Sequence, residues 1–394
     1  MKSAAVIGTG LIGTSIALAL TRRGVAVHLR DKSLTAARTA AALGAGTLDP
    51  PPGQVDLAVL AVPPGFVGTE LARCQERGLA RAYTDVASVK SSPQDAITKA
   101  GGDPAGYVGG HPMAGGERSG PLAGRADLFE GRLWVLTPSD LTRTSVLNQT
   151  LEMVSLCGAV PTVMQATAHD RAVALTSHTP HLVSALLAAR LAEAEPDALR
   201  VSGQGLRDVT RIAAGSPFMW RDILEANASA VAEVLDALAA DLAQTITTLR
   251  ALAGDDPAGR RHSGAALETL LRRGNAGCAR IPQKHGVPRA RYVSVPVAIT
   301  DRSGVLAELL ASASASGVNI EDIRIEHSVG SRSGCVELVV ESSSAERLRK
   351  ELSVHGWALR DTRRSDCPDE SAGSDDSECD AAGTFHPGQE RKVI

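Results

Sequence analysis

The sequence predicts an α/β domain, an all-helical domain and a small α+β domain, followed by an acidic tail. Short apolar strands alternate with helical segments up to about residue 164, which predicts a parallel sheet covered by helices on both faces. Residues 169–253 are rich in Ala and Leu at helical spacing and show no strand pattern. From Arg291 strands and helices alternate again. We therefore place the domains at 1–164, 165–286, 291–362 and 363–394.

Composition restricts the class of protein. Of the 394 residues, 43% are hydrophobic and 22% charged, which is typical of a globular protein. A net charge of -3 argues against broad binding to nucleic acid or to an anionic membrane. The six cysteines include no CxxC pair, which favours reduced thiols in the cytoplasm over disulfides or a zinc site.

The N-terminal apolar run MKSAAVIGTGLIGTSIALAL resembles a secretory signal, but three glycines interrupt it and an α/β pattern follows at once. We therefore expect neither a signal peptide nor a membrane span. In the α/β domain we expect a helix over about 11–21. The expected strands are 4–8, 25–30, 56–62, 82–88, 107–112 and 132–138.

A glycine-rich turn follows the first strand. Gly8, Gly10 and Gly13 form G-x-G-x-x-G, and Leu11 and Ile12 open the next helix. The glycines permit a tight turn, close approach of backbone to a pyrophosphate, and packing of helix on strand, while the helix N-terminus offers free N–H groups. This context predicts a Rossmann-type dinucleotide-binding domain rather than an ordinary glycine turn.

The nucleotide is predicted from Asp31, at the end of the second strand. Its carboxylate accepts hydrogen bonds from ribose hydroxyls and repels a 2′-phosphate, which favours NAD over NADP. The flanking Arg30 and Lys32 keep NADP as an alternative.

Ser88 and His111 lie in the segments DVASVK and GGHPMAGGERSG, which follow predicted strands. Ligands bind at the carboxyl ends of the strands in an open parallel sheet, so both side chains are expected beside the nicotinamide. A neutral imidazole accepts a hydroxyl proton as hydride leaves the same carbon, and Ser88 holds that hydroxyl or orients the ring. A lone histidine is more often structural; its position is what favours catalysis.

The helical domain carries SHTPH, with His178 and His181 three residues apart, and the segment DVTRIAAGSPFMWRDI. The histidine pair has no third ligand at motif spacing, so we predict no metal site. Arg211 is a candidate clamp for a carboxylate, oriented by Asp208. Arg221 and Asp222 fit a solvated helix face better.

These blocks, together with GTGLIG and in this order, resemble the prephenate dehydrogenase (TyrA) family, which includes arogenate dehydrogenases. The resemblance covers about residues 4–285, and GGHPMAG and DVTRIA are its specific parts. It implies a dinucleotide-binding domain, a helical dimerisation domain and a homodimer. The implied reaction is the NAD-dependent oxidative decarboxylation of prephenate to 4-hydroxyphenylpyruvate, in tyrosine biosynthesis.

The resemblance also implies residue roles. His111 bonds the C4 hydroxyl of the substrate, and Ser88 contacts that histidine, the hydroxyl and the nicotinamide. Glu117 lies near the mouth of the site. Gly116 replaces a threonine of some members, so one hydroxyl contact is missing. Substrate-pocket and carboxylate-binding roles are implied for His178, His181, Arg211 and Asp208.

The third domain, YVSVPVAITDRSGVLAELLASASASGVNIEDIRIE, resembles an ACT domain with a ferredoxin-like fold, a module that often binds amino acids. Asp301, Gly304, Asn319 and Ile320 match its ligand positions. Feedback by tyrosine is the implied function; a domain that only aids assembly is the alternative. The tail is acidic, without Lys or Arg over 366–380, and is expected to be disordered.

Three other functions remain open. An arogenate dehydrogenase would catalyse the same reaction on a substrate that differs from prephenate only in its side chain. A β-hydroxyacid dehydrogenase shares the architecture but not the specific blocks. A non-catalytic amino-acid sensor would keep the ACT domain, although the joint presence of Ser88, His111 and Arg211 argues against lost activity.

Overall fold

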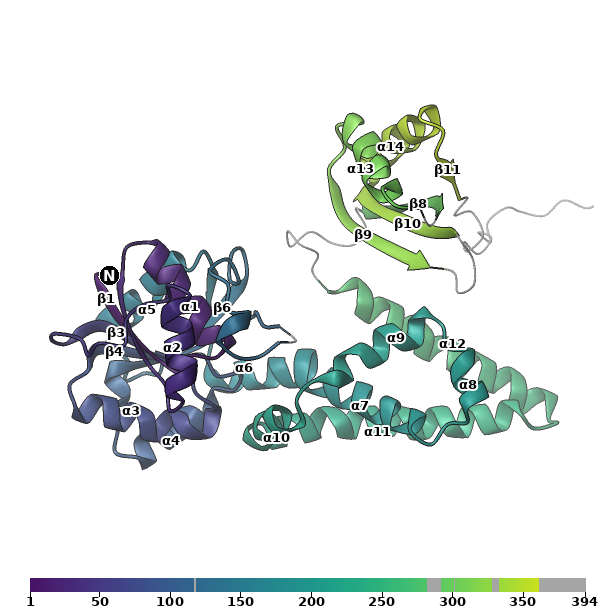
Figure 1. Cartoon of the computed structure of the whole chain (residues 1–394). Helices are drawn as coiled ribbons and strands as arrows, with labels where there is room; N and C mark the ends of the chain where they lie inside the picture. Colours follow the sequence, from purple (N-terminus) through teal and green to yellow (C-terminus); the bar gives the residue numbers. More distant parts are fainter. Residues whose placement is uncertain (117, 282–291, 301, 328–332, 361–394) are drawn as a thin grey trace, which may run out of the picture. The chain divides into compact units, whose positions relative to one another are not determined.

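The computed structural model describes residues 1–116, 118–281, 292–300, 302–327 and 333–360. The chain divides into two compact units, Met1–Leu267 and Glu268–Ile394 (Figure 1). The first unit contains both the α/β part and most of the helical part. Glu117, Asp301 and the acidic tail lie outside the described residues.

A seven-stranded sheet forms the centre of the α/β part, in the order β2-β1-β3-β4-β5-β6-β7. Gly8 follows β1, at the switch point of the strand order between β1 and β3, where ligands bind in such sheets. The strands are β1 (Ser3–Ile7), β2 (Ala26–Arg30), β3 (Val55–Leu60), β4 (Ala80–Asp85), β5 (Tyr107–Pro112), β6 (Leu133–Thr137) and β7 (Val160–Val163).

The prediction of a parallel sheet is wrong at one pair, because β5 and β6 are antiparallel. Among the described residues of the connection, 113–116 and 118–132, there is a 3-10 turn at Pro121–Ala123 and no α-helix to carry the chain back across the sheet. Strand β7 was not predicted. Its four residues are mostly exposed and lack an apolar pattern.

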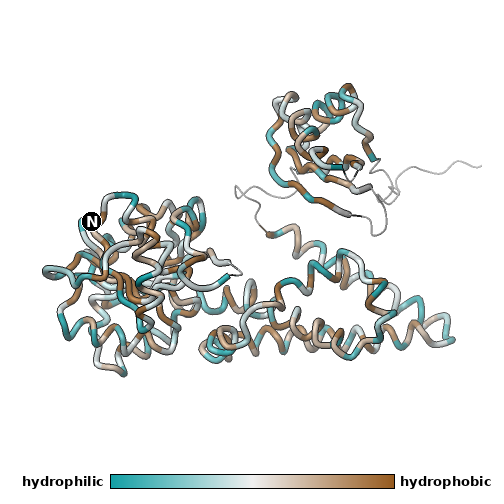
Figure 2. Tube along the Cα trace, in the orientation of Figure 1, coloured by the Kyte–Doolittle hydropathy of each residue, from teal (hydrophilic) through white to brown (hydrophobic). Residues whose placement is uncertain are grey.

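Helices cover both faces of this sheet, as predicted. In β1, Ala4 and Val6 belong to one apolar cluster, whereas Ala5 and Ile7 belong to the other. This alternation follows from the two-residue period of a strand and explains why the central strands, such as β1, are mostly apolar (Figure 2). The helices are α1 (Leu11–Arg22), α2 (Leu34–Ala42), α3 (Val67–Glu76), α4 (Ser91–Lys99) and α5 (Thr144–Leu156).

Helices follow β7 from Ala166 to Ala279, which includes the predicted helical stretch 169–253. A π-helical turn, η4 (Ala174–His178), joins two α-helices without a break in the helical run. Several leucines and an isoleucine of α7 and α11, including Leu186, Leu242 and Ile246, are exposed. The helices are α6 (Ala166–Val173), α7 (Thr179–Leu191), α8 (Pro196–Arg200), α9 (Gln204–Arg211), α10 (Pro217–Ala226), α11 (Ala228–Leu252) and α12 (Pro257–Ala279).

The second unit contains an antiparallel sheet in the order β11-β8-β10-β9. Val297, Leu309, Leu338 and Leu348 are buried in its core, so both helices pack on the sheet. The predicted strand and helix sequence is present, with β11 as a further strand. Its elements are β8 (Tyr292–Thr300), α13 (Val305–Ala315), β9 (Ile320–His327), β10 (Ser333–Glu341), α14 (Ser342–Val354) and β11 (Ala358–Leu359).

Replacing Gly8 by alanine is expected to destabilise the first unit. Gly8 has φ +99°, and an added Cβ would lie 2.1 Å from the carbonyl oxygen of Ala61. Backbone strain of this kind costs about 1–3 kcal/mol before the clash is counted. Gly10→Ala is the matched control, because Gly10 has φ -72° and open space around it. Urea unfolding followed by circular dichroism should show a lower midpoint for Gly8→Ala alone; equal midpoints would contradict this account.

Candidate active site

The turn after β1 is shaped to receive a phosphate group. An added Cβ at Gly13 would lie 1.9 Å from the carbonyl oxygen of Gly8, so the helix approaches the turn closely. At Gly10 nothing lies within 4 Å of that position, which leaves the backbone open to a ligand. Gly10 is also the N-cap of α1 and has no side chain to cap it, so the N–H groups of the first turn, from Leu11 and Ile12 onward, are available to an anion.

Asp31 follows β2 and is held beside this turn. Its Oδ2 accepts hydrogen bonds from Thr9 N (2.6 Å) and Thr9 Oγ1 (2.9 Å), and its Oδ1 accepts from Ser33 N (2.8 Å). Oδ2 thus accepts two hydrogen bonds, and Oδ1 keeps a lone pair that can accept one from a ribose hydroxyl. The guanidinium of Arg30 lies 3.8 Å from Glu70 Oε1 of α3, so it is paired with a carboxylate of the protein.

His111 lies near the carboxyl end of β5, and the half-buried Ser88 lies in the loop between β4 and α4. No hydrogen bond among the described residues joins the two side chains. The glycines before His111 have a packing role: an added Cβ at Gly109 would lie 2.4 Å from Thr137 Oγ1, and at Gly110 2.6 Å from the carbonyl oxygen of Asp85. The glycines that leave room for a ligand are therefore Gly115 and Gly116, which are exposed.

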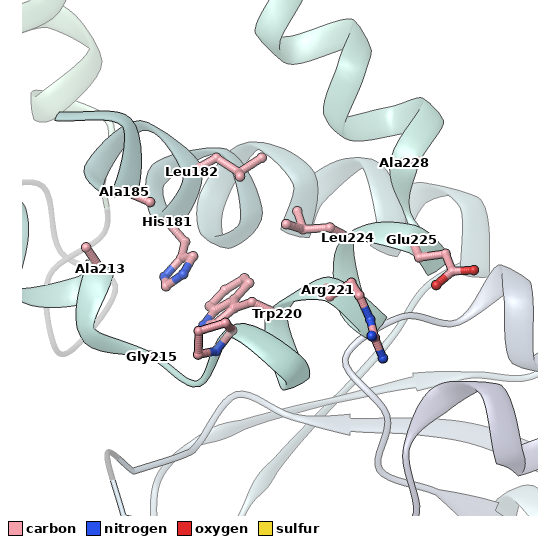
Figure 3. A pocket seen from close by; sticks show the side chains of 11 residues that line it. His181, Leu182, Ala185, Ala213, Gly215, Trp220, Arg221, Leu224, Glu225 and Ala228 are labelled. Atoms are coloured by element: carbon pink, nitrogen blue, oxygen red, sulfur yellow. The ribbon is translucent and has the colours of Figure 1, made fainter. Parts of the chain in front are cut away.

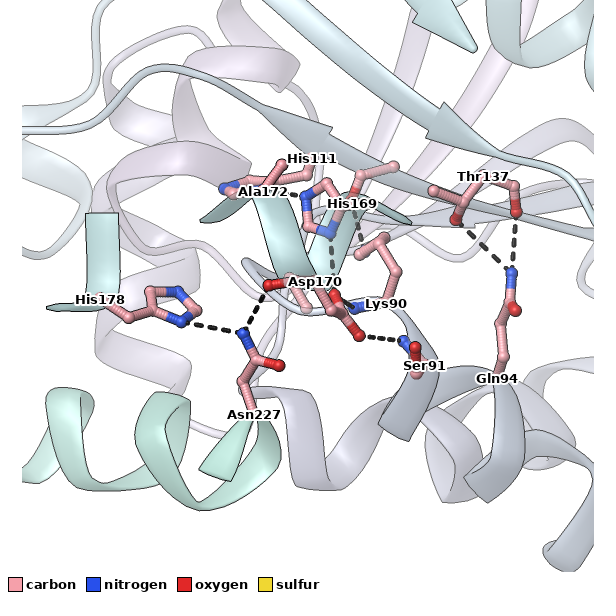
Figure 4. A network of polar contacts seen from close by, with 12 residues as sticks. Lys90, Ser91, Gln94, His111, Thr137, His169, Asp170, Ala172, His178 and Asn227 are labelled. Carbon is pink, nitrogen blue, oxygen red and sulfur yellow. Dashed lines mark hydrogen bonds and ion pairs between the residues drawn. The ribbon is translucent and has the colours of Figure 1, made fainter. Parts of the chain in front are cut away.

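A chain of hydrogen bonds runs from His111 into the helical part (Figure 4). His111 Nδ1 lies 2.8 Å from His169 Nε2, and His169 Nδ1 lies 2.8 Å from Asp170 Oδ1. The Asp170 carboxylate also accepts from the backbone N–H groups of Lys90 and Ser91, each at 2.8 Å. The two carboxylate oxygens thus bond the start of α4 and the neighbouring histidine at once.

His169 and Asp170 were not predicted from the sequence. They read as two polar residues on a helix, and their partners lie 58 and about 80 positions away. The one signal available was a histidine followed by an acid at the point where strands give way to helices. Lys90 belongs to the block DVASVK but was given no role.

Lys90 is buried, and its Nζ lies 2.7 Å from both carboxylate oxygens of Asp85 and 2.6 Å from the carbonyl oxygen of Gly110. Burial lowers the pKa of Lys90, and the Asp85 carboxylate opposes that shift. Burial also acts to raise the pKa of Asp170, but hydrogen bonds from His169, Ser91 and Lys90 outweigh it and lower the pKa to about 2. Asp170 is therefore ionised at neutral pH.

Burial lowers the pKa of His111 well below its usual value, with Lys90 adding to the shift. Burial likewise lowers the pKa of His178 to about 4. Both rings are therefore neutral at neutral pH. Asn227 Nδ2 donates to the carbonyl oxygen of Asp170 (2.9 Å) and to His178 Nδ1 (3.1 Å). Because His178 Nδ1 accepts, its proton lies on Nε2, so this ring offers a donor.

His181 stacks on Trp220, with ring centroids 3.6 Å apart and planes 9° apart. The pair lies along a mostly apolar pocket of about 620 Å³, lined also by Leu182, Ala213 and Arg221 (Figure 3). Burial lowers the pKa of His181. Trp220 also meets His178 edge-on at 6.1 Å, so the two histidines of SHTPH share one aromatic neighbour.

The predicted pairing of Asp208 with Arg211 stays a prediction. Both residues lie on α9 and are exposed, and Asp208 accepts a hydrogen bond from Gln204 Nε2 (2.8 Å). Gln204 is one turn away on the same helix, so it reaches the carboxylate without bending the backbone. Arg221 pairs with Asp222 at 2.8 Å, as a solvated face would.

One helical run, Ala166–Leu191, is long and apolar enough to cross a membrane by those two measures alone. It also carries His169, Asp170 and His178, whose side chains hydrogen bond to other parts of the first unit. These contacts identify the run as part of the site.

Residues 16–163 match the family described as prephenate dehydrogenase, nucleotide-binding domain, and residues 165–258 match prephenate dehydrogenase, dimerization domain. The chain belongs to the prephenate dehydrogenase family. This is a family of dehydrogenases, so the α/β part is a nucleotide-binding domain and the expected resemblance is confirmed.

Individual members of the prephenate dehydrogenase family support this. "Probable prephenate dehydrogenase NovF" of Streptomyces niveus is 43% identical over 359 residues, which cover 91% of this chain and 99% of that protein. The structure of prephenate dehydrogenase from A. aeolicus in complex with hydroxyphenyl propionate and NAD+ is 26% identical, with a TM-score of 0.59, over 70% of this chain and 98% of that one. Synechocystis arogenate dehydrogenase is 25% identical, with the same TM-score and coverage.

Stability is expected to fall as the pH is lowered from 6.5 to 4. In that window the unfolded chain protonates His178, whereas the folded protein, with its pKa at about 4, does not. The unfolded state then binds more protons, so acid favours it. His178→Gln should reduce the slope of unfolding free energy against pH, measured by urea titration. His262→Gln, at an exposed position on α12, is the control. Equal slopes in all three proteins would refute this assignment.

Proposed function

We propose that this chain catalyses the NAD-dependent oxidative decarboxylation of prephenate to 4-hydroxyphenylpyruvate. The observation that carries the proposal is the neutral His111, at the carboxyl end of a strand in the nucleotide-binding domain, with Nδ1 tied into a buried hydrogen-bond chain. A base in this position accepts the C4 hydroxyl proton of the substrate. NAD, when bound, accepts the hydride that leaves C4.

The protein's own residues supply orientation and proton handling. The hydroxyl proton moves to His111 as hydride leaves C4. The ring carboxylate then departs as carbon dioxide, its electron pair enters the ring, and the phenolate oxygen takes the proton back. We assign Ser88 to the hydroxyl, and Arg211 to a substrate carboxylate through paired hydrogen bonds. His181 and Trp220 line the pocket, and we assign His178 to the substrate as well. Glu117, assigned to the mouth of the site, lies outside the described residues.

Two observations support NAD as the cofactor. Asp31 is held by Thr9 and Ser33, and its Oδ1 keeps a lone pair for a ribose hydroxyl. Arg30, the candidate ligand of a 2′-phosphate, is paired with Glu70. The structure described for the A. aeolicus relative also contains NAD+.

Prephenate is favoured over arogenate by the polarity of His178. Arogenate has an ammonium group where prephenate has a keto oxygen, and a neutral His178 offers an N–H group, which bonds an oxygen and not an ammonium group. The relative at 43% identity is also named as a prephenate dehydrogenase. Arogenate dehydrogenase is the alternative, since the Synechocystis enzyme has the same fold.

A homodimer follows from the helical part, where the exposed apolar side chains of α7 and α11 would be covered by a second copy. The matched region is described as a dimerization domain. Sedimentation of the purified protein measures this directly.

Purified protein is expected to reduce NAD in the presence of prephenate, measured as reduced-nicotinamide absorbance, and to respond weakly to arogenate or NADP. His111→Asn should lower kcat by about 10²–10⁴-fold, because it removes the proton acceptor. His262→Gln should behave as wild type. A response to arogenate alone would identify arogenate as the substrate and leave the proposed mechanism unchanged. No response to either substrate, with either nucleotide, would refute the proposal and favour a sensor.

We also propose that the second unit is an ACT domain that binds tyrosine. Its β8-α13-β9-β10-α14-β11 order is that of the expected ferredoxin-like fold, and Gly304 (φ +89°) caps α13 beside the turn between strand and helix. Asn319 hydrogen bonds Glu321 next to Ile320, the first residue of β9. The match to the Streptomyces niveus relative spans 359 residues, which is more than the two family domains contain.

Asn319→Ala in the full chain is expected to raise the tyrosine concentration for half-inhibition by about tenfold, the value of one lost hydrogen bond. Ser343→Ala, at an exposed position of α14, is the matched control and should leave inhibition unchanged. Steady-state rates against tyrosine concentration give both numbers. A wild-type protein insensitive to tyrosine would leave assembly as the role of this unit.

A further inference from the structure

His169 and Asp170 are buried directly behind His111, with exposed fractions of 1% and 5%. Burying a carboxylate costs several kcal/mol unless it is fully hydrogen bonded, and this one accepts three hydrogen bonds. We propose that His169 and Asp170 are positioning residues that fix the tautomer of His111 and take up the charge that His111 gains during turnover. The charge-uptake part rests on the proposed function; the tautomer part concerns the resting protein.

The tautomer follows from the direction in which each hydrogen bond must run. The Asp170 carboxylate only accepts, so His169 Nδ1 donates to it over 2.8 Å. In the arrangement we propose, His169 carries its proton on Nδ1 alone, so its Nε2 has a lone pair and His111 Nδ1, at 2.8 Å, donates to it. His111 is left with a lone pair on Nε2. The chain of three residues therefore presents the substrate with a proton acceptor, which is the form that a base requires.

The charges around His111 favour this role. The groups that face it are Lys90, His169, His178 and Asp170. Lys90 is neutralised by Asp85 at 2.7 Å, burial favours the neutral rings of His111 and His178, and in the proposed arrangement His169 carries one ring proton. One negative charge therefore remains in this buried cluster, on Asp170. A proton that enters through His111 makes the cluster neutral, so the protonated state is stabilised inside the protein.

The proton balance of the reaction agrees with a proton that is held inside the protein and then returned to the product. The substrate O–H bond breaks and a bond to His111 Nε2 forms, while the Nδ1 proton of His111 shifts to His169 Nε2. Both shifts reverse when the phenolate oxygen takes its proton back, so no proton is released overall. A buried relay without contact with solvent at His169 suits this sequence, because the proton has to be held and returned.

The first test is nitrogen NMR of the ligand-free full chain with 15N-labelled histidine, which distinguishes N–H from lone-pair nitrogens. The His111 signals are assigned by their loss in His111→Asn. Wild type should carry its proton on Nδ1 of His111. His169→Gln should keep this tautomer, since the amide oxygen accepts from Nδ1. His169→Leu removes the acceptor and should move the proton to Nε2. His262→Gln is the control and should match wild type.

Kinetics with prephenate and NAD test charge uptake. His169→Leu should lower kcat by about 10²-fold with KM within about threefold, because only a transition-state interaction is lost. His169→Gln keeps the tautomer but cannot take the proton, so its kcat should lie between those of His169→Leu and wild type. Wild-type His111 protonated on Nε2, or full activity in both variants, would overturn the inference. If wild type oxidises no substrate, the proposed function fails while the tautomer result still decides the positioning role.

Discussion

The Asp170 carboxylate is the contact on which the first unit depends. It accepts hydrogen bonds from the backbone at the start of α4 and from His169. The backbone carbonyl oxygen of Asp170 accepts a further hydrogen bond from the Asn227 side chain, just before α11. A buried charge must keep all its donors, since losing one leaves it poorly solvated in a low-dielectric interior. The nucleotide-binding and helical parts are therefore joined by a polar contact that permits one relative placement, which is the placement that brings His111 and His178 to the same cluster.

Two histidines of this site present opposite polarity although they are chemically identical. Burial keeps both rings neutral, so each has a single N–H group, and the partner at Nδ1 decides where it lies. In the proposed chain His169 accepts a hydrogen bond from His111, whereas Asn227 donates one to His178. One residue type thus supplies an acceptor and a donor, and the choice is made by neighbours that need not touch the substrate.

Local signals predicted much of this structure, and long-range pairing supplied the rest. The Gly8–Gly13 turn, Asp31 and the position of His111 were predictable, because each depends on a few consecutive residues and on the end of a strand. The antiparallel β5–β6 pair was not, since it depends on the absence of a helix in a glycine-rich connection. The polar cluster was hidden for another reason: Lys90 and Asp170 belong to residue types that usually face water, and only the fold reveals their partners.

The π-helical turn at Ala174–His178 decides where the length of this segment can change. A π-helical turn takes about one residue more than an α-helical turn, so removing one residue from η4 would leave an α-helical turn and nearly the same rotation of α7 against α6. Removing a residue from the start of α7 would instead rotate the residues after it by about 100°, and His181 and Ser184 would leave the buried face. A change of length is therefore tolerated best at the turn, where the buried His178 still restricts which residue can be lost.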